Sequence, residues 1–165
     1  MTIPVAEVAI LIGLQGAGKS TFYHMHLAAT HRHISKDNFR NAKSRDKRQQ
    51  TLLREALQEG TSVTIDNTNP SLADRIPLLQ TAHEFGARAV AYYFEPELTT
   101  CLERNAGRAG IARVPDVALY VTFNKLQAPS FMEGFAAIYH VRNLGNGSFE
   151  ITAQHEEPAN GGHNS

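Results

Sequence analysis

The sequence has little that would tie it to a membrane, a disulfide scaffold or a strongly charged partner. It contains one cysteine, Cys101, which cannot form a disulfide within the chain. Acidic and basic residues balance at 16 each, so no overall charge favours a long nucleic-acid footprint or an anionic membrane surface. No apolar run is long enough to span a bilayer, and the N-terminus lacks the basic-then-apolar layout of a signal peptide. We therefore expect a cytoplasmic protein with no membrane partner, whose basic sites are local.

What the chain has is the composition of one globular domain. Its 165 residues, of which 42% are hydrophobic, are enough to bury a single core. Apolar patterns predict strands over 5–12, 33–35, 62–65, 87–94, 136–141 and 149–152, and helices over 19–29, 46–59, 70–85, 97–105 and 115–126. Strands that alternate with helices form parallel βαβ units. We predict an α/β fold over 1–153, with a largely parallel sheet covered by helices on both faces, and a flexible tail over 154–165.

Residues 13–20, GLQGAGKS, match the phosphate-binding pattern G-x-x-x-x-G-K-[ST] in full. They lie between a predicted strand and a predicted helix, which is the context that this motif requires. The glycines allow the loop to point its backbone N–H groups at anionic phosphates. Lys19 is predicted to reach the β- and γ-phosphates, and the Ser20 hydroxyl to coordinate Mg²⁺. The residues predicted to bind ATP from this segment are Gly13, Gly16, Ala17, Gly18, Lys19, Ser20 and Thr21.

Two polar segments follow predicted strands, at the sheet edge where ligands gather in doubly wound folds. A phosphoryl acceptor needs a carboxylate to take its proton and a cation to hold its phosphate, and Asp37 and Arg40 suit these tasks. A helix N-cap at Asp37 and a surface position for Arg40 are the alternative.

The second of these segments is Asp66-Asn67-Thr68-Asn69-Pro70. Asp66 could order magnesium-bound water or an acceptor-site arginine, and Thr68 and Asn69 could bond acceptor or phosphate oxygens. An Asx turn before Pro70 is the alternative for Asn69.

Arginines bracket a glycine-containing segment over 107–114, which we expect to act as a lid over the triphosphate. Arg104, Arg108 and Arg113 could neutralise charge on the moving phosphoryl group. A second basic group could line an entrance for a nucleic-acid backbone, although the start of a solvated helix explains it equally well. Its members are Arg40, Lys43, Arg45, Lys47 and Arg48.

Four blocks in order resemble the kinase domain of polynucleotide 5′-hydroxyl kinases. They are GLQGAGKS (13–20), DNFR (37–40), TIDNTNP (64–70) and VPDVALYVTFNKLQAPSFMEGF (114–135), and the last is similar to the kinase half of animal polynucleotide kinase-phosphatases. The resemblance implies a P-loop kinase fold and transfer of the ATP γ-phosphate to the 5′-hydroxyl of DNA or RNA, as in nucleic-acid repair. It also implies that Asp37 is the general base, that Arg40 binds the acceptor phosphate and that Asp66 is an acceptor-site residue. Arg104 and Arg108 match the family's lid arginines better than Arg113.

Two other functions remain open from the sequence. A small-metabolite or nucleoside kinase of the same fold would fit the neutral charge and the lack of the phosphatase or ligase domain to which the family's kinases are commonly fused. A nucleotide-binding switch is disfavoured, because the segment 124–127, NKLQ, has Gln127 where the guanine-reading N-K-x-D pattern needs a carboxylate. We predict an ATP-dependent phosphotransferase with magnesium as cofactor, DNA or RNA 5′ ends as acceptor and no obligate protein partner.

Overall fold

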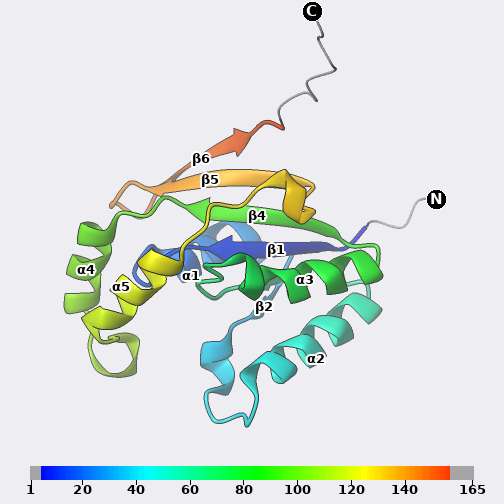
Figure 1. The fold of residues 1–165 in the computed structure, drawn as a ribbon, viewed down its shortest axis with the longest axis horizontal. Helices are drawn as coiled ribbons and strands as arrows, with labels where there is room; N and C mark the ends of the chain where they lie inside the picture. The colour runs from blue at the N-terminus through cyan, green and yellow to red at the C-terminus, as the bar shows by residue number, and fades with distance from the viewer. Residues whose placement is uncertain (1–4, 157–165) are drawn as a thin grey trace, which may run out of the picture.

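The apolar run near the N-terminus forms the centre of the sheet in the computed structural model, which describes residues 5–156 (Figure 1). The six strands are β1 (Glu7–Ile12), β2 (Arg32–Ile34), β3 (Val63–Ile65), β4 (Arg88–Phe94), β5 (Ala137–Asn143) and β6 (Phe149–Gln154), in the order β2-β3-β1-β4-β5-β6. All neighbouring strands are parallel except β5 and β6, which are antiparallel. The predicted α/β fold with a largely parallel sheet is confirmed.

Helices cover both faces of this sheet because β1 is apolar on both sides. Val8 and Ile10 belong to the core under α2 (Arg45–Gln58) and α3 (Leu72–Glu84). Ala9 and Leu11 belong to the opposite core, under α1 (Lys19–Phe22), α4 (Leu98–Ala106) and α5 (Asp116–Lys125). The alternation along β1 therefore separates two apolar layers, one on each face.

The first predicted helix, over 19–29, differs in form from the expectation. The α-helical turn of α1 passes at Tyr23 into a π-helix, η1 (Tyr23–Leu27), and the Ala28 N–H donates to the carbonyl of Tyr23 over 2.8 Å. Three short 3₁₀ segments were not predicted: η2 (Lys36–Phe39), η3 (Gly110–Ala112) and η4 (Phe131–Glu133). A hydrophobic period of 3.6 residues does not reveal one residue added to a turn, nor a helix of three or four residues.

The C-terminal boundary also differs from the prediction. Strand β6 continues to Gln154, which pairs with Ile138 and whose side-chain oxygen lies 2.6 Å from His140 Nε2. Gln154 is therefore part of the sheet and not of a tail. Positions 157–165 of the predicted flexible tail lie outside the described residues. Within the described part of the chain, no helix is long and apolar enough to cross a membrane.

Candidate active site

The phosphate loop joins β1 to α1 and is packed closely against α4, β5 and β6. Gly16 and Gly18 adopt φ values of 82° and 95°, which side chains other than glycine rarely adopt. A Cβ on Gly18 would lie 2.6 Å from Asn143 Nδ2, and this amide donates to the Ala17 carbonyl over 3.2 Å. Neither position tolerates a side chain, so the two glycines fix a narrow loop at the N-terminus of α1, the arrangement that binds phosphate groups.

Lys19 is held inside this loop. Its side chain is buried, and Nζ donates to the carbonyls of Gly13 (3.0 Å) and Leu14 (2.6 Å). Burial lowers the pKa of Lys19 from 10.5 to about 8, although the nearby Asp66 carboxylate acts in the opposite direction. The ammonium has exchanged most of its water for two carbonyl oxygens, so an anionic phosphate beside it would be a strongly stabilising partner.

Ser20 and Asp66 form the adjoining part of the site. The Ser20 hydroxyl donates to Asp66 Oδ2 over 2.7 Å, and Asp66 is 5% exposed. Burial alone would raise the pKa of Asp66, but hydrogen bonds from His33 and Ser20 and the charge of Lys19 outweigh it, so the pKa lies below its ordinary value. Asp66 is thus an anion next to the predicted magnesium ligand. The contact with Ser20 favours the role in which Asp66 orders magnesium-bound water over the role in which it holds an acceptor-site arginine.

The chemistry of these donors fits magnesium that arrives with a nucleotide. Among residues 5–156, no three or more His, Cys, Asp or Glu side chains lie close enough to form a metal site by themselves. Magnesium in phosphoryl-transfer sites commonly uses one or two protein oxygens, with phosphates and water completing the coordination. The Ser20 hydroxyl would supply one such protein oxygen, and the Asp66 carboxylate lies directly behind it.

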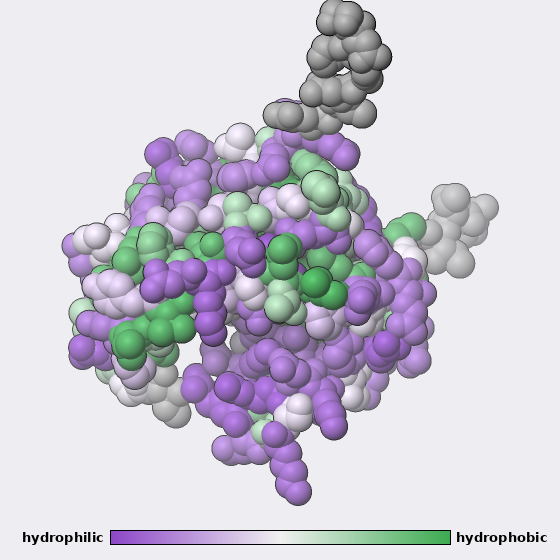
Figure 2. Space-filling model, viewed as in Figure 1, coloured by the Kyte–Doolittle hydropathy of each residue, from purple (hydrophilic) through white to green (hydrophobic). Residues whose placement is uncertain are grey.

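The predicted donor and acceptor residues meet in one cleft of about 690 Å³. Figure 2 shows it as a hollow between the α5 side of the molecule and the strongly polar surface around η2 and the start of α2. Predicted site residues that line it are Gly16, Gly18, Lys19, Ser20, Thr21, Asp37, Arg40, Asp66, Thr68 and Arg108. Five lining residues that the sequence did not single out for the site are Gln15, Lys36, Asn67, Ala112 and Val114.

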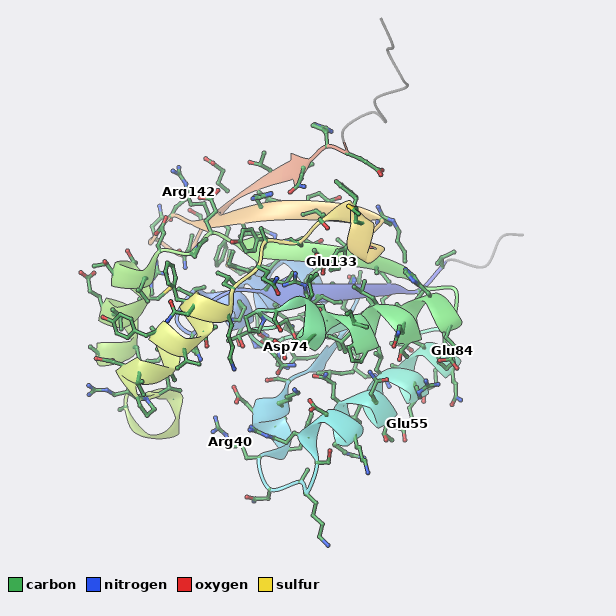
Figure 3. The ribbon with its side chains drawn as sticks, viewed as in Figure 1. Arg40, Glu55, Asp74, Glu84, Glu133 and Arg142 are labelled. Carbon is green, nitrogen blue, oxygen red and sulfur yellow. The ribbon has the colours of Figure 1, made fainter. Side chains whose placement is uncertain are left out.

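Asp37 on η2 and Arg40 directly after η2 lie at the open side of the cleft. Their side chains are 72% and 47% exposed, and Arg40 Nη2 lies 3.3 Å from Asp37 Oδ1. The Ser35 hydroxyl, which accepts the Asp37 N–H over 3.3 Å, is the N-cap of η2, so the alternative in which Asp37 is the cap is wrong. Figure 3 shows Arg40, just past the end of η2, extending toward the side where α5 lies. The carboxylate of Asp37 is therefore open to an incoming hydroxyl.

The Asn69 side chain faces the interior and does not line the cleft, contrary to the sequence prediction. It is buried with φ at 44°, and its amide donates to the carbonyl of Leu11 over 2.8 Å. The left-handed backbone turns the chain ahead of Pro70, and the amide is used inside the protein. Thr68 lines the cleft, and its carbonyl accepts the Gly13 N–H over 3.0 Å. Its bond to acceptor or phosphate oxygens stays a prediction.

The two predicted lid arginines lie in different places. Arg104, on α4, donates from Nη1 to the Gly16 carbonyl over 3.0 Å and supports the phosphate loop without lining the cleft. Arg108 lines the cleft and donates from Nη1 to the Ala112 carbonyl over 3.4 Å. The segment over 107–114 thus borders the cleft, and the catalytic role of Arg108 stays a prediction. Of the second basic group, Arg40 and Arg45 line the cleft.

Asn67 is a structural partner that the sequence analysis missed. Its Oδ1 accepts the Lys36 N–H over 2.9 Å, and its Nδ2 donates to Gln49 Oε1 over 2.6 Å. These bonds tie the segment after β3 to η2 and α2. The sequence feature that could have indicated this role is its position directly after Asp66.

This fold is that of a P-loop kinase. The chain matches the AAA_33 family model, described as AAA domain, over residues 8–128, and it belongs to that family. It is also 25% identical over 139 residues to the bifunctional polynucleotide phosphatase/kinase of Schizosaccharomyces pombe (strain 972 / ATCC 24843), a match that covers 82% of this chain and 33% of that protein. The chain therefore spans about a third of the length of this curated relative. The predicted resemblance to polynucleotide kinases is confirmed.

Solved structures share the fold. A gluconokinase from Sinorhizobium meliloti 1021 matches with a TM-score of 0.58 and 19% identity, covering 86% of this chain and 84% of that one. A fungal RNA kinase matches with a TM-score of 0.64 and 17% identity, covering 84% and 38%. The AvrRxo1-ORF1:AvrRxo1-ORF2 structure with ATP matches with a TM-score of 0.66 and 13% identity, covering 90% and 57%. At these identities the matches establish the P-loop kinase fold.

Proposed function

We propose that the protein transfers the γ-phosphoryl group of ATP to the 5′-hydroxyl of a DNA or RNA end. The observation that carries this proposal is the single cleft that contains both the phosphate-loop residues Lys19 and Ser20 and the exposed pair Asp37 and Arg40. Phosphoryl transfer depends mainly on positioning the donor and acceptor and on stabilising charge, and one cleft with both sets of groups can do both.

The donor half would be filled by ATP. The backbone N–H groups of the phosphate loop and the Lys19 ammonium would hold the phosphates, and Ser20 and Asp66 would hold magnesium. Bound magnesium would offset the charge of the phosphates. The fold shared with a structure that contains ATP supports this choice of nucleotide. Arg108, on the border of the cleft, would then stabilise the negative charge that develops on the γ-phosphoryl group during transfer.

The acceptor half would use Asp37 and Arg40. Asp37 would take the proton of the attacking hydroxyl, and Arg40 would hold a phosphate of the same strand. For both to act, Arg40 must turn from Asp37 to the acceptor. An exposed ion pair contributes only about 0–1 kcal/mol, so this change costs little.

A nucleic-acid acceptor is favoured over a small metabolite by the charge at the open side of the cleft. Five basic residues and two carboxylates line the cleft, and three of the basic residues, Lys36, Arg40 and Arg45, come from the segment around Asp37, where phosphates of a strand would pass. The 25% identity to a protein named as a bifunctional polynucleotide phosphatase/kinase supports the same choice.

A panel of acceptors tests this proposal. The protein is given ATP labelled in the γ-phosphate together with 5′-hydroxyl DNA and RNA oligonucleotides, nucleosides or sugars, and the labelled product is measured. We expect label on the oligonucleotides and none with Lys19→Ala, which loses the cation at the phosphates. Label only on nucleosides or sugars would refute the nucleic-acid acceptor and support the small-metabolite kinase.

A further inference from the structure

Asp66 has a second hydrogen-bond donor that the proposed function does not use. His33 Nε2 lies 2.7 Å from Asp66 Oδ2, the same oxygen that accepts the Ser20 hydroxyl. Because Asp66 is an anion, its oxygen accepts and the His33 nitrogen must carry a proton. A histidine, a carboxylate and a hydroxyl thus form a chain that leads to the predicted magnesium ligand.

The His33 ring is fixed by its surroundings. It lies on β2, where it pairs in register with Thr64 of β3, and the Asp66 N–H continues this ladder to the Ile34 carbonyl over 2.8 Å. The ring of Tyr23 packs against it, with centroids 4.4 Å apart, and the Tyr23 hydroxyl is itself bonded to the His31 carbonyl over 2.6 Å. With its side chain only 25% exposed, His33 has a defined orientation toward Asp66.

The bond matters because Asp66 has to keep one orientation. If the Ser20 oxygen binds magnesium, its hydroxyl proton still needs an acceptor, and Asp66 Oδ2 is in place to be that acceptor. Partners behind the immediate ligands of a metal orient those ligands and tune their basicity. Without the His33 N–H, a buried carboxylate would lose a donor that offsets its desolvation and would be free to turn.

We propose that His33 is a positioning residue, whose Nε2–H holds the Asp66 carboxylate against the Ser20 hydroxyl and thereby strengthens binding of a magnesium–nucleotide complex. The groups that face the ring are Asp66 at the end of β3 and Tyr23 and His24 on η1. The inference rests on the proposed function only so far as the site binds magnesium with a nucleotide. It does not depend on the acceptor.

The test compares the affinity for ADP in magnesium with the affinity in EDTA, measured by calorimetry without any acceptor. His33→Phe keeps a ring but removes the donor, and we expect the ratio of the two affinities to fall by about 10- to 100-fold. His33→Gln restores an N–H near the same place and should recover most of the ratio. His31→Phe is the matched control, because His31 makes a similar bond to Glu7 over 2.9 Å, away from the cleft. Its ratio should equal that of the wild type.

An unchanged ratio in His33→Phe, or a wild-type affinity that does not respond to magnesium, would overturn the inference. So would equal losses in His33→Phe and His33→Gln. If His33→Phe does not fold, nitrogen NMR of the wild type decides: we expect His33 to carry its proton on Nε2, and a neutral ring protonated only on Nδ1 would refute the bond. If the panel of acceptors shows no label on oligonucleotides, the nucleic-acid acceptor is refuted. The affinity ratio still tests His33, because it is measured without an acceptor.

Discussion

Replacing Asp37 with asparagine should separate the proposed chemistry of this residue from its structural contacts. The side chain is 72% exposed and its carboxylate pairs with Arg40 over 3.3 Å. Asparagine has nearly the same shape and can still accept a hydrogen bond from Arg40, but it cannot take a proton from a hydroxyl. The variant therefore removes basicity and little else.

The structure sets the expected size of each effect. An exposed ion pair contributes about 0–1 kcal/mol, so Asp37→Asn should melt within a few degrees of the wild type. A general base contributes roughly 10²- to 10⁴-fold in rate, equal to about 3–5 kcal/mol in the barrier. We expect a loss of that size in the rate of transfer, with the affinities for ATP and acceptor nearly unchanged.

A single-turnover assay with an excess of enzyme over labelled ATP and a saturating 5′-hydroxyl oligonucleotide measures this step. Glu84→Gln is a matched control, because Glu84 is also an exposed carboxylate paired with an arginine, Arg54, and neither residue lines the cleft. It should retain the wild-type rate. If Asp37→Asn transfers phosphate at the wild-type rate while chemistry is limiting, Asp37 is not the base.

Four further predictions concern other charged residues of the site and the core. Arg40→Ala should raise the acceptor KM steeply, and more for a 3′-phosphorylated nucleotide than for a nucleoside; equal effects on both would contradict a phosphate grip. Arg108→Ala should lower kcat more than ATP affinity, and an unchanged rate at saturating ATP would make it an ordinary loop residue. The pKa of Lys19 falls from 10.5 to about 8 on folding, so the unfolded chain binds more protons between these values. The free energy of unfolding should therefore rise with pH across that window in the wild type relative to Lys19→Met, and parallel curves in denaturant titrations would refute the shift. Arg75→Ala should lower the free energy of unfolding by about 3–5 kcal/mol, because it leaves the buried Glu133 carboxylate, 2.8 Å from Arg75 Nε, without its partner; a loss under about 1 kcal/mol would show that the pair is dispensable.

The features that the sequence determined are those encoded by residues close together in the chain. The phosphate loop is eight consecutive residues, and Asp37 and Arg40 are three apart on one short segment, so their spacing alone placed them together. The parallel sheet followed from the alternation of apolar strands with amphipathic helices, because that order leaves few ways to bury both faces.

Only the tertiary structure decided which side chains meet across the sheet. The bond between Ser20 and Asp66 joins residues 46 apart, that between His33 and Asp66 joins residues 33 apart, and Asn143 reaches the phosphate loop over 126 residues. The tertiary structure also turns the Asn69 side chain into the interior, although its position after β3 had predicted a place at the edge of the sheet where ligands bind. The physical reason is that a hydrogen bond forms only when its donor and acceptor atoms lie within about 3 Å of each other. A shift of one residue in strand register moves side chains by about 3.3 Å, which is enough to break such a contact. Register and packing between distant segments arise only when the whole core assembles.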